Sequence, residues 1–84
     1  MSIFNITLNI ETVVIFYDKD RNFTGANLCG HDNIGGYNMM ATLNKDYVDT
    51  LTLYARYEEQ EDKEDGGFTV RFSGFDVKEM SKYR

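Results

Sequence analysis

Hydrophobic and polar positions alternate at the start of the chain. A period of two places successive side chains on opposite faces of a β-strand, whereas a helix would spread the apolar residues around its circumference. Residues 2–10 are therefore predicted to form a strand, which leads into the stretch VVIFY at 13–17. A strand that is apolar on both faces is expected to be covered on both sides. The pattern leaves open whether residues 2–17 form one bent strand or a tight hairpin near Glu11.

The middle of the chain is divided by polar and glycine-rich segments. DKDRN at 18–22 has the composition of a turn, and FTGANL at 23–28 is predicted to be a short strand that returns from it. CGHDNIGG at 29–36 contains three glycines and is expected to be a loop. YNMMATL at 37–43 is predicted to be a further strand.

Residues 47–59 fit two patterns. As a helix capped by Asn44, they would place an apolar stripe on one side. As a strand, they alternate leucine with threonine and tyrosine, which are residue types that favour a β conformation. We favour the strand. The helical stripe would consist of Tyr47, Val48, Leu51, Tyr54 and Ala55, and one face of the strand of Leu51, Leu53, Ala55 and Tyr57.

The last part of the chain alternates again in FTVRF at 68–72, which predicts a long hairpin of residues 50–58 with 68–73. After Gly74, the spacing of Asp76 and Glu79 resembles a capping box and predicts a short terminal helix. The whole pattern indicates one domain, residues 1–84, with a mainly β fold. It would be an antiparallel sheet of five or six strands, and a short helix would make it α+β.

The segment EEQEDKEDGG at 58–67 holds six carboxylates in eight positions. With Lys63 subtracted, the acidic segment (residues 58–65) carries a formal charge of −5, and the whole chain also has −5 at pH 7. A direct nucleic-acid binder needs clustered basic residues, and the nine Lys and Arg of this chain are scattered. The charge therefore argues against nucleic acid and against an anionic membrane surface, and it suits a basic protein partner or plain solubility.

The acidic segment has a charge density comparable with that of nucleic acid. Eight extended residues span roughly 26 Å, over which one DNA strand carries about eight charges. The nearby tyrosines would supply aromatic anchors, with Phe68 beside them. The predicted partner-binding residues are Glu58, Glu59, Glu61, Asp62, Glu64, Asp65, Tyr54 and Tyr57. The alternative is a solvated hairpin tip without a partner.

The candidates for chemistry are few. Cys29, His31 and Asp32 lie together, but zinc sites use ligands from two spaced pairs, and the chain has one cysteine and one histidine. A Cys29–His31 nucleophilic pair would lack a third catalytic group. The turn at 18–22 has the first oxygen ligands of a calcium loop without its glycine and final Glu. We therefore expect no enzyme activity, no metal and no cofactor.

In size, acidity and the missing catalytic motif, the chain resembles the small acidic proteins that bacteriophages encode to block host defences, such as anti-CRISPR proteins and uracil-DNA glycosylase inhibitors. The resemblance covers general character only and carries over no site. It implies a non-enzymatic inhibitor that imitates DNA and binds a basic nucleic-acid-handling protein of the bacterial host. The first twenty residues lack the pattern of a signal peptide, so a cytoplasmic protein is expected.

A second hypothesis is a structural module that forms a homodimer. An exposed edge strand, with residues 2–10 as the candidate, would pair with a second copy, and the acidic segment would only keep the protein soluble.

Overall fold

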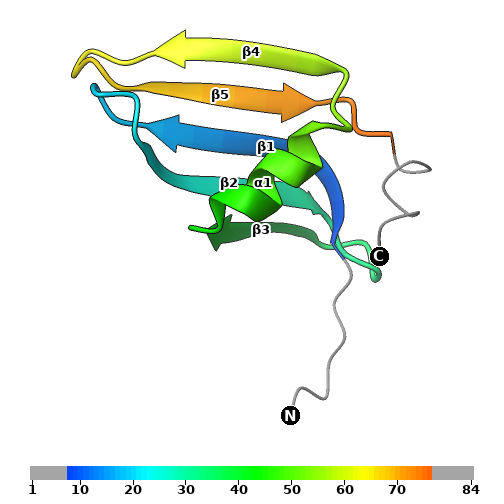
Figure 1. Cartoon of the computed structure of the whole chain (residues 1–84). Helices are drawn as coiled ribbons and strands as arrows, with labels where there is room; N and C mark the ends of the chain where they lie inside the picture. Colours follow the sequence, from blue (N-terminus) through cyan, green and yellow to red (C-terminus); the bar gives the residue numbers. More distant parts are fainter. Residues whose placement is uncertain (1–7, 77–84) are drawn as a thin grey trace.

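The computed structural model describes residues 8–76, which form one antiparallel sheet and one helix (Figure 1). The strand order is β3-β2-β1-β5-β4, so β1 is central and β3 and β4 are the two edges. The mainly β prediction is confirmed, with five strands and one short helix. The elements are β1 (Asn9–Tyr17), β2 (Phe23–His31), β3 (Tyr37–Thr42), α1 (Lys45–Thr52), β4 (Tyr57–Asp62) and β5 (Phe68–Ser73).

The core lies between the sheet and α1, which crosses one face (Figure 1). Alternate residues of β1 point to this face, and Val13 and Ile15 are among its most buried side chains. The helix contributes Val48 and Leu51, which are three residues apart and so lie on one side of it. The buried cluster consists of Val13, Ile15, Ala26, Leu28, Val48 and Leu51.

The second face of β1 differs from the prediction. The apolar stretch 13–17 was expected to be covered on both sides, but within residues 8–76 the only helix packs on the Val13 face. Val14 and Phe16 point the other way and are half-buried. The long side chain of Lys63 lies over Phe16 on this face, with its Nζ 5.4 Å from the centroid of the ring.

The start of the chain resolves one open alternative. Residues 9–17 form a single strand, so there is no hairpin near Glu11; a register shift between Ile10 and Thr12 leaves Glu11 as a bulge. Asn9 and Ile10 pair with His31 and Gly30 of β2 on one side, whereas β5 pairs with β1 only from Thr12 onward, so the described end of the 2–10 segment has a strand partner on one side only. The rest of that predicted strand lies outside the described residues, as does the predicted helix after residue 76.

Residues 45–52 form a helix, so the preferred strand interpretation of 47–57 is wrong. The side chain of Asn44 accepts a hydrogen bond of 3.0 Å from the Tyr47 N–H and caps the helix, as the alternative interpretation expected. The chain leaves the sheet at one edge with β3 and re-enters it at the other with β4. The connection must cross a face of the sheet, and burying Val48 and Leu51 there outweighs the β preference of the threonines.

The last hairpin is shorter and shifted relative to the prediction. β4 begins at Tyr57, and β4 pairs with β5 from Tyr57↔Ser73 to Asp62↔Phe68. Most of the acidic segment is therefore inside a strand, and only Lys63–Gly67 forms the turn. An edge strand that buries neither face needs no apolar residues, because its partner strand supplies the hydrogen bonds.

The three hairpins use the same five-residue turn. In each, the N–H of the first residue donates to the carbonyl of the fifth: Asp18 to Asn22 at 3.0 Å, and Asp32 to Gly36 and Lys63 to Gly67 at 2.8 Å. The fourth residue has positive φ, at 65° for Arg21, 91° for Gly35 and 90° for Gly66. The predicted turn at 18–22 is confirmed, and the predicted loop at 29–36 is shortened because β2 continues to His31.

Candidate functional site

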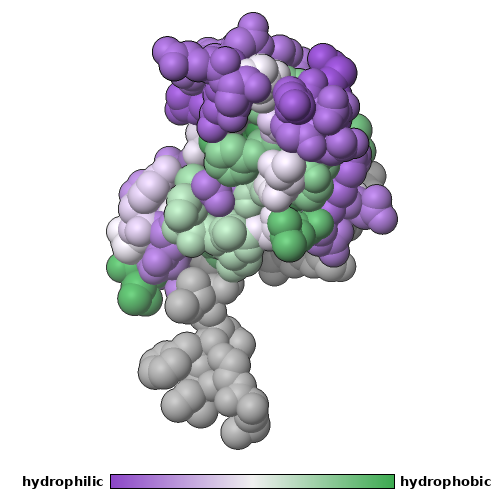
Figure 2. Space-filling view, turned by 90° about the vertical axis from the view of Figure 1, so that its left-hand side faces the viewer, coloured by the Kyte–Doolittle hydropathy of each residue, from purple (hydrophilic) through white to green (hydrophobic). Residues whose placement is uncertain are grey.

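The acidic segment runs along the free side of the sheet. β4 is the last strand in the sheet order, and all six of its residues, YEEQED, are exposed. Figure 2 looks onto the end of the sheet that carries the β4–β5 turn, and shows hydrophilic residues gathered at the top, with hydrophobic residues below them. The predicted carboxylates therefore lie together at one edge of the molecule.

Strand alternation divides these carboxylates between two faces. Glu59 and Glu61 point to the face without the helix, where their neighbours on β5 are Arg71 and Thr69. Glu58 and Asp62 share the other face with Gln60 between them, opposite the apolar residues of β5. Residues two apart on one face of a strand are separated by about 6.8 Å. The edge thus presents charge on both sides of its backbone.

Within the described part of the chain, little of this charge is neutralised. Ion pairs among residues 8–76 join Glu11 with His31, Asp49 with Lys45 and Asp76 with Arg56, and none of them involves the acidic segment. Two nearby cations face aromatic rings instead. Lys63 lies over Phe16, and the guanidinium carbon of Arg21 lies 4.9 Å from the centroid of the Phe68 ring.

The acidic segment also accounts for the net charge of the protein. It contains six of the 14 Asp and Glu residues and one of the nine Lys and Arg residues. The remainder of the chain has eight acidic and eight basic residues and is formally neutral. The charge is therefore concentrated at a single edge rather than spread over the surface.

The carboxylates of the acidic segment differ in the hydrogen bonds that they accept. Asp65 accepts a hydrogen bond of 2.8 Å from the Gly67 N–H and helps to fix the turn, and Asp62 accepts one of 2.9 Å from the Gln60 side chain. The carboxylates of Glu59, Glu61 and Glu64 accept no hydrogen bond from residues 8–76. Together with Glu58, these are the carboxylates of the acidic segment whose neutralisation would remove no hydrogen bond within the described chain.

The structure separates the predicted aromatic anchors. Tyr57 opens β4 on the same face as Glu59 and is 63% exposed. Tyr54 is half-buried in the turn after α1, where its carbonyl accepts a hydrogen bond of 3.0 Å from Asp76 N–H, so it is not on the strand. Phe68 is buried and stacks on Tyr17 with ring centroids 4.8 Å apart, so it is part of the packing. Of these three aromatic residues, Tyr57 is the one that is exposed and lies on the acidic strand.

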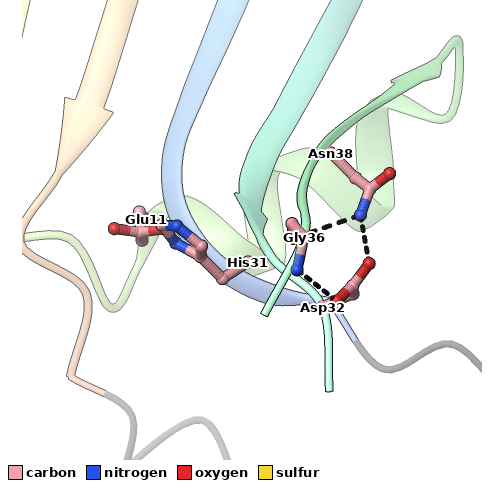
Figure 3. A network of polar contacts seen from close by, with 5 residues as sticks. All are labelled: Glu11, His31, Asp32, Gly36 and Asn38. Atoms are coloured by element: carbon pink, nitrogen blue, oxygen red, sulfur yellow. Dashed lines mark hydrogen bonds and ion pairs between the residues drawn. The ribbon is translucent and has the colours of Figure 1, made fainter. Parts of the chain in front are cut away.

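A second polar cluster lies at the β2–β3 turn (Figure 3). His31 Nδ1 lies 2.5 Å from a carboxylate oxygen of Glu11. The Asp32 carboxylate accepts hydrogen bonds of 2.8 Å from the Gly36 N–H and 2.6 Å from the Asn38 amide. Desolvation acts to raise the pKa of Asp32, but these bonds and that from the Ile34 N–H outweigh it and lower the pKa.

The hydrogen bonds of this cluster hold the turn together. The ring nitrogen of His31 closest to an acceptor is directed at Glu11, not at the half-buried Cys29. Among residues 8–76, no three His, Cys, Asp or Glu side chains are grouped so that they could hold a metal ion. The oxygen atoms of Asp18 in the first turn accept bonds from Asp20 and Asn22 and play the same part there.

Two features of the acidic edge were not inferred from the sequence. One is its place in the sheet, and the other is the pairing of Lys63 and Arg21 with aromatic rings instead of carboxylates. The run of acidic residues was visible, but a strand made of them has no hydrophobic periodicity, which is the main signal for strands.

Three comparisons with known proteins found no match to the chain. No protein-family model, no curated protein sequence and no solved structure matches it. No helix within residues 8–76 is long and apolar enough to cross a membrane.

Proposed function

We propose that this protein is a non-enzymatic inhibitor that binds a basic, nucleic-acid-handling protein of a bacterial host through the acidic edge of β4. The observation that carries the proposal is the concentration of a formal charge of −5, equal to that of the whole chain, on the exposed strand β4 and its turn, with no ion pair to these carboxylates from residues 8–76. The protein would act in the cytoplasm of an infected cell, as the phage inhibitors that it resembles do.

The spacing of the charges supports imitation of a nucleic-acid strand. β4 places four carboxylates in six residues, about 20 Å of extended chain, where one DNA strand carries about six phosphates. A groove that accepts phosphates would attract this edge and release counterions in the same way. Tyr57, exposed at the start of the strand, would add apolar contact area with a polar tip.

The carboxylates of the acidic segment, which form no ion pair within residues 8–76, repel one another in the free protein. Such repulsion lowers the stability of the free fold, and a basic partner relieves it on binding. Charge complementarity of this kind mainly accelerates association and makes it dependent on salt. Binding is therefore expected to be fast, stoichiometric and weakened as the salt concentration rises.

Affinity capture with matched variants tests the proposal. The tagged protein would be exposed to bacterial lysate at about 150 mM salt, where charges more than about 8 Å apart are already screened. The test variant Glu59→Gln, Glu61→Gln, Glu64→Gln changes carboxylates that accept no hydrogen bond within the described chain. The control variant Asp20→Asn, Asp46→Asn, Asp49→Asn changes the net charge equally at exposed positions elsewhere.

The proposal expects one nucleic-acid-binding protein to be captured by the native chain and by the control. The test variant should bind that protein more than about tenfold more weakly, and a DNA or RNA oligonucleotide should displace the native chain from it. Equal binding of both variants, or a captured partner that nucleic acid does not displace, would contradict the proposal.

A further inference from the structure

The edge of the sheet opposite β4 is uncharged and largely apolar. β3 is paired with β2 on one side and with no described strand on the other. The twelve residues 33–44 that contain it, NIGGYNMMATLN, include no charged side chain. Tyr37, Met39 and Met40 are 62%, 63% and 54% exposed, and Leu43 just after the strand is 78% exposed. An exposed apolar edge without charge, proline or bulge is a template for pairing with another strand.

The backbone groups available at this edge follow from the hairpin register. The Asp32 N–H donates to the Gly36 carbonyl, so these two residues form a hydrogen-bonded pair. The next pair, His31↔Tyr37, is therefore a non-hydrogen-bonded pair. Alternation then directs the N–H and C=O groups of Tyr37, Met39 and Ala41 away from β2. Three residues therefore present donors and acceptors that no described strand uses.

We propose that β3 pairs with β3 of a second copy of this chain, antiparallel and centred on Met39. In this register Met39 lies opposite Met39 of the second copy, and Tyr37 lies opposite Ala41. All three outward-facing residues then exchange both of their hydrogen bonds with the second copy. The contact is isologous, so it closes as a two-fold dimer with a continuous ten-stranded sheet.

Charge selects the second copy and this edge. Pairing two β4 strands would oppose Glu58, Glu59, Glu61 and Asp62 of one copy to those of the other, and like charges across a strand pair are destabilising. Pairing β3 with β4 would desolvate the same carboxylates against methionine, and as a head-to-tail contact it would not close. Two β3 strands meet without any charge.

A groove beside β3 offers space for a side chain of the second copy. It has a volume of about 350 Å³ and is open on the face that lacks the helix. Ala41, Asn27, Phe16 and Leu43 are among the residues that line it. In the proposed register Tyr37 of the second copy stands beside Ala41 on this face, because residues opposite one another point to the same side. The small alanine leaves the groove open to the tyrosine ring.

The dimer would keep the two acidic edges free. In a ten-stranded sheet with strands about 4.8 Å apart, the two β4 strands lie at opposite ends, about 43 Å from each other. A contact of one strand per copy buries less than the about 800 Å² per partner of a standard interface, so dissociation in the micromolar range is expected. The proposal does not depend on the function proposed for β4.

Sedimentation velocity of the full chain tests the pairing without any partner. Over about 5 to about 500 µM, the native chain should shift from monomer to dimer, as mass action requires. Met39→Lys places two cations opposite each other at the centre of the contact and should remove the dimer. Leu53→Lys adds the same charge at the end of α1, at a residue that is 79% exposed and belongs to neither edge strand, and should leave the dimer intact.

Disulfide trapping tests the register. Position 39 would form a hydrogen-bonded pair with its equivalent, with Cα atoms about 5.5 Å apart, which suits a disulfide. In a Cys29→Ala background, Met39→Cys should oxidise to a covalent dimer, while Gln60→Cys, the central outward position of β4, should not. A native chain that stays monomeric throughout, a dimer that survives Met39→Lys, or trapping at position 60 alone would each overturn the proposal. Dimerisation that occurs only after removal of residues 1–7 would also overturn the proposal, because it would mean that this segment, and not a second copy, pairs with β3 in the full chain.

Discussion

The two edges of the sheet share their geometry and differ in their side chains. β3 and β4 are each six residues long, and each is joined to its inner neighbour by the same type of five-residue turn. In both strands, every second residue directs its backbone hydrogen-bonding groups away from the sheet. β4 carries four carboxylates on this framework, whereas β3 carries none.

This difference shows that strand geometry alone does not decide what an edge binds. Charged side chains on an edge oppose the addition of another strand, because pairing would desolvate them and bring like charges together. The acidic edge is thus suited to a basic surface and protected from sheet extension. The neutral edge has no such protection and is suited to a strand of its own kind.

The largest loss of stability is expected from disrupting the pairing of β1 with β2, which joins β2 and β3 to the rest of the sheet. A Cβ at Gly30 would lie 1.9 Å from the Asn9 carbonyl oxygen, at the β1–β2 bulge, so the two backbones must separate. Gly30→Ala should lower the free energy of unfolding by about 3 kcal/mol, measured by urea denaturation.

Gly35→Ala is the matched control for that substitution. It adds the same methyl group in open space, where only the positive φ of 91° opposes it, so a loss of about 1 to 2 kcal/mol is expected. Equal losses for the two variants would mean that the close approach at Gly30 does not constrain the β1–β2 pairing.

An intermediate effect is expected from making the two edges alike. Glu59→Thr with Glu61→Thr removes two charges from β4 and inserts residues that favour strands. With both edges able to pair, the protein should form assemblies larger than dimers, detectable by light scattering at neutral pH. Adding Met39→Lys to the same chain should limit the assembly to dimers through β4. A chain that remains no larger than the native protein would show that charge is not what protects this edge.

The smallest effect concerns the turn that precedes β3. The pKa of Asp32 is lowered from its ordinary value of 3.8, so the folded chain stabilises the ionised carboxylate more than the unfolded chain does. This contribution is present above the unfolded pKa and is lost as the pH falls through the lower, folded pKa. Asp18 in the first turn shifts in the same direction, mainly because of the hydrogen bond from the Asn22 N–H.

Asp32→Asn should therefore lower the melting temperature modestly at pH 7 and have less effect near pH 2.5, well below the ordinary pKa of 3.8, because the contribution of the ionised carboxylate declines as the pH falls. Thermal melts followed by circular dichroism at the two pH values measure this. Asp46→Asn, which removes an exposed carboxylate in the first turn of α1, is the control. A difference between native and Asp32→Asn that grows in acid would contradict the assigned role of Asp32.

Several parts of this arrangement could be predicted from individual stretches of sequence. The apolar run at 13–17 identified the central strand, since a strand inside a sheet carries a hydrophobic signal that needs no other element to explain it. FTVRF likewise marked β5, and DKDRN marked a turn, because the residues that build these features are adjacent in the chain. The acidic segment was visible for the same reason.

Other parts depended on residues far apart in sequence. Residues 47–57 fitted both a helix and a strand, and the choice followed from the need to cross the sheet from β3 to β4 and to bury Val48 and Leu51. β4 has no apolar periodicity, and it is a strand because β5 offers its backbone as a partner. The position of α1 on the Val13 face, which leaves no described helix over Val14 and Phe16, also depends on long-range packing.

The sequence by itself therefore determined that this is a small, mainly β protein with its net charge gathered in one segment, because alternation and charge are local properties of the chain. Only the tertiary structure decided that the charged segment and the neutral segment 37–42 become the two opposite edges of a single sheet. Edge position depends on strand order, and strand order is set by long-range pairing and by the packing of α1. Neither of these can be read from the sequences of the edge strands themselves.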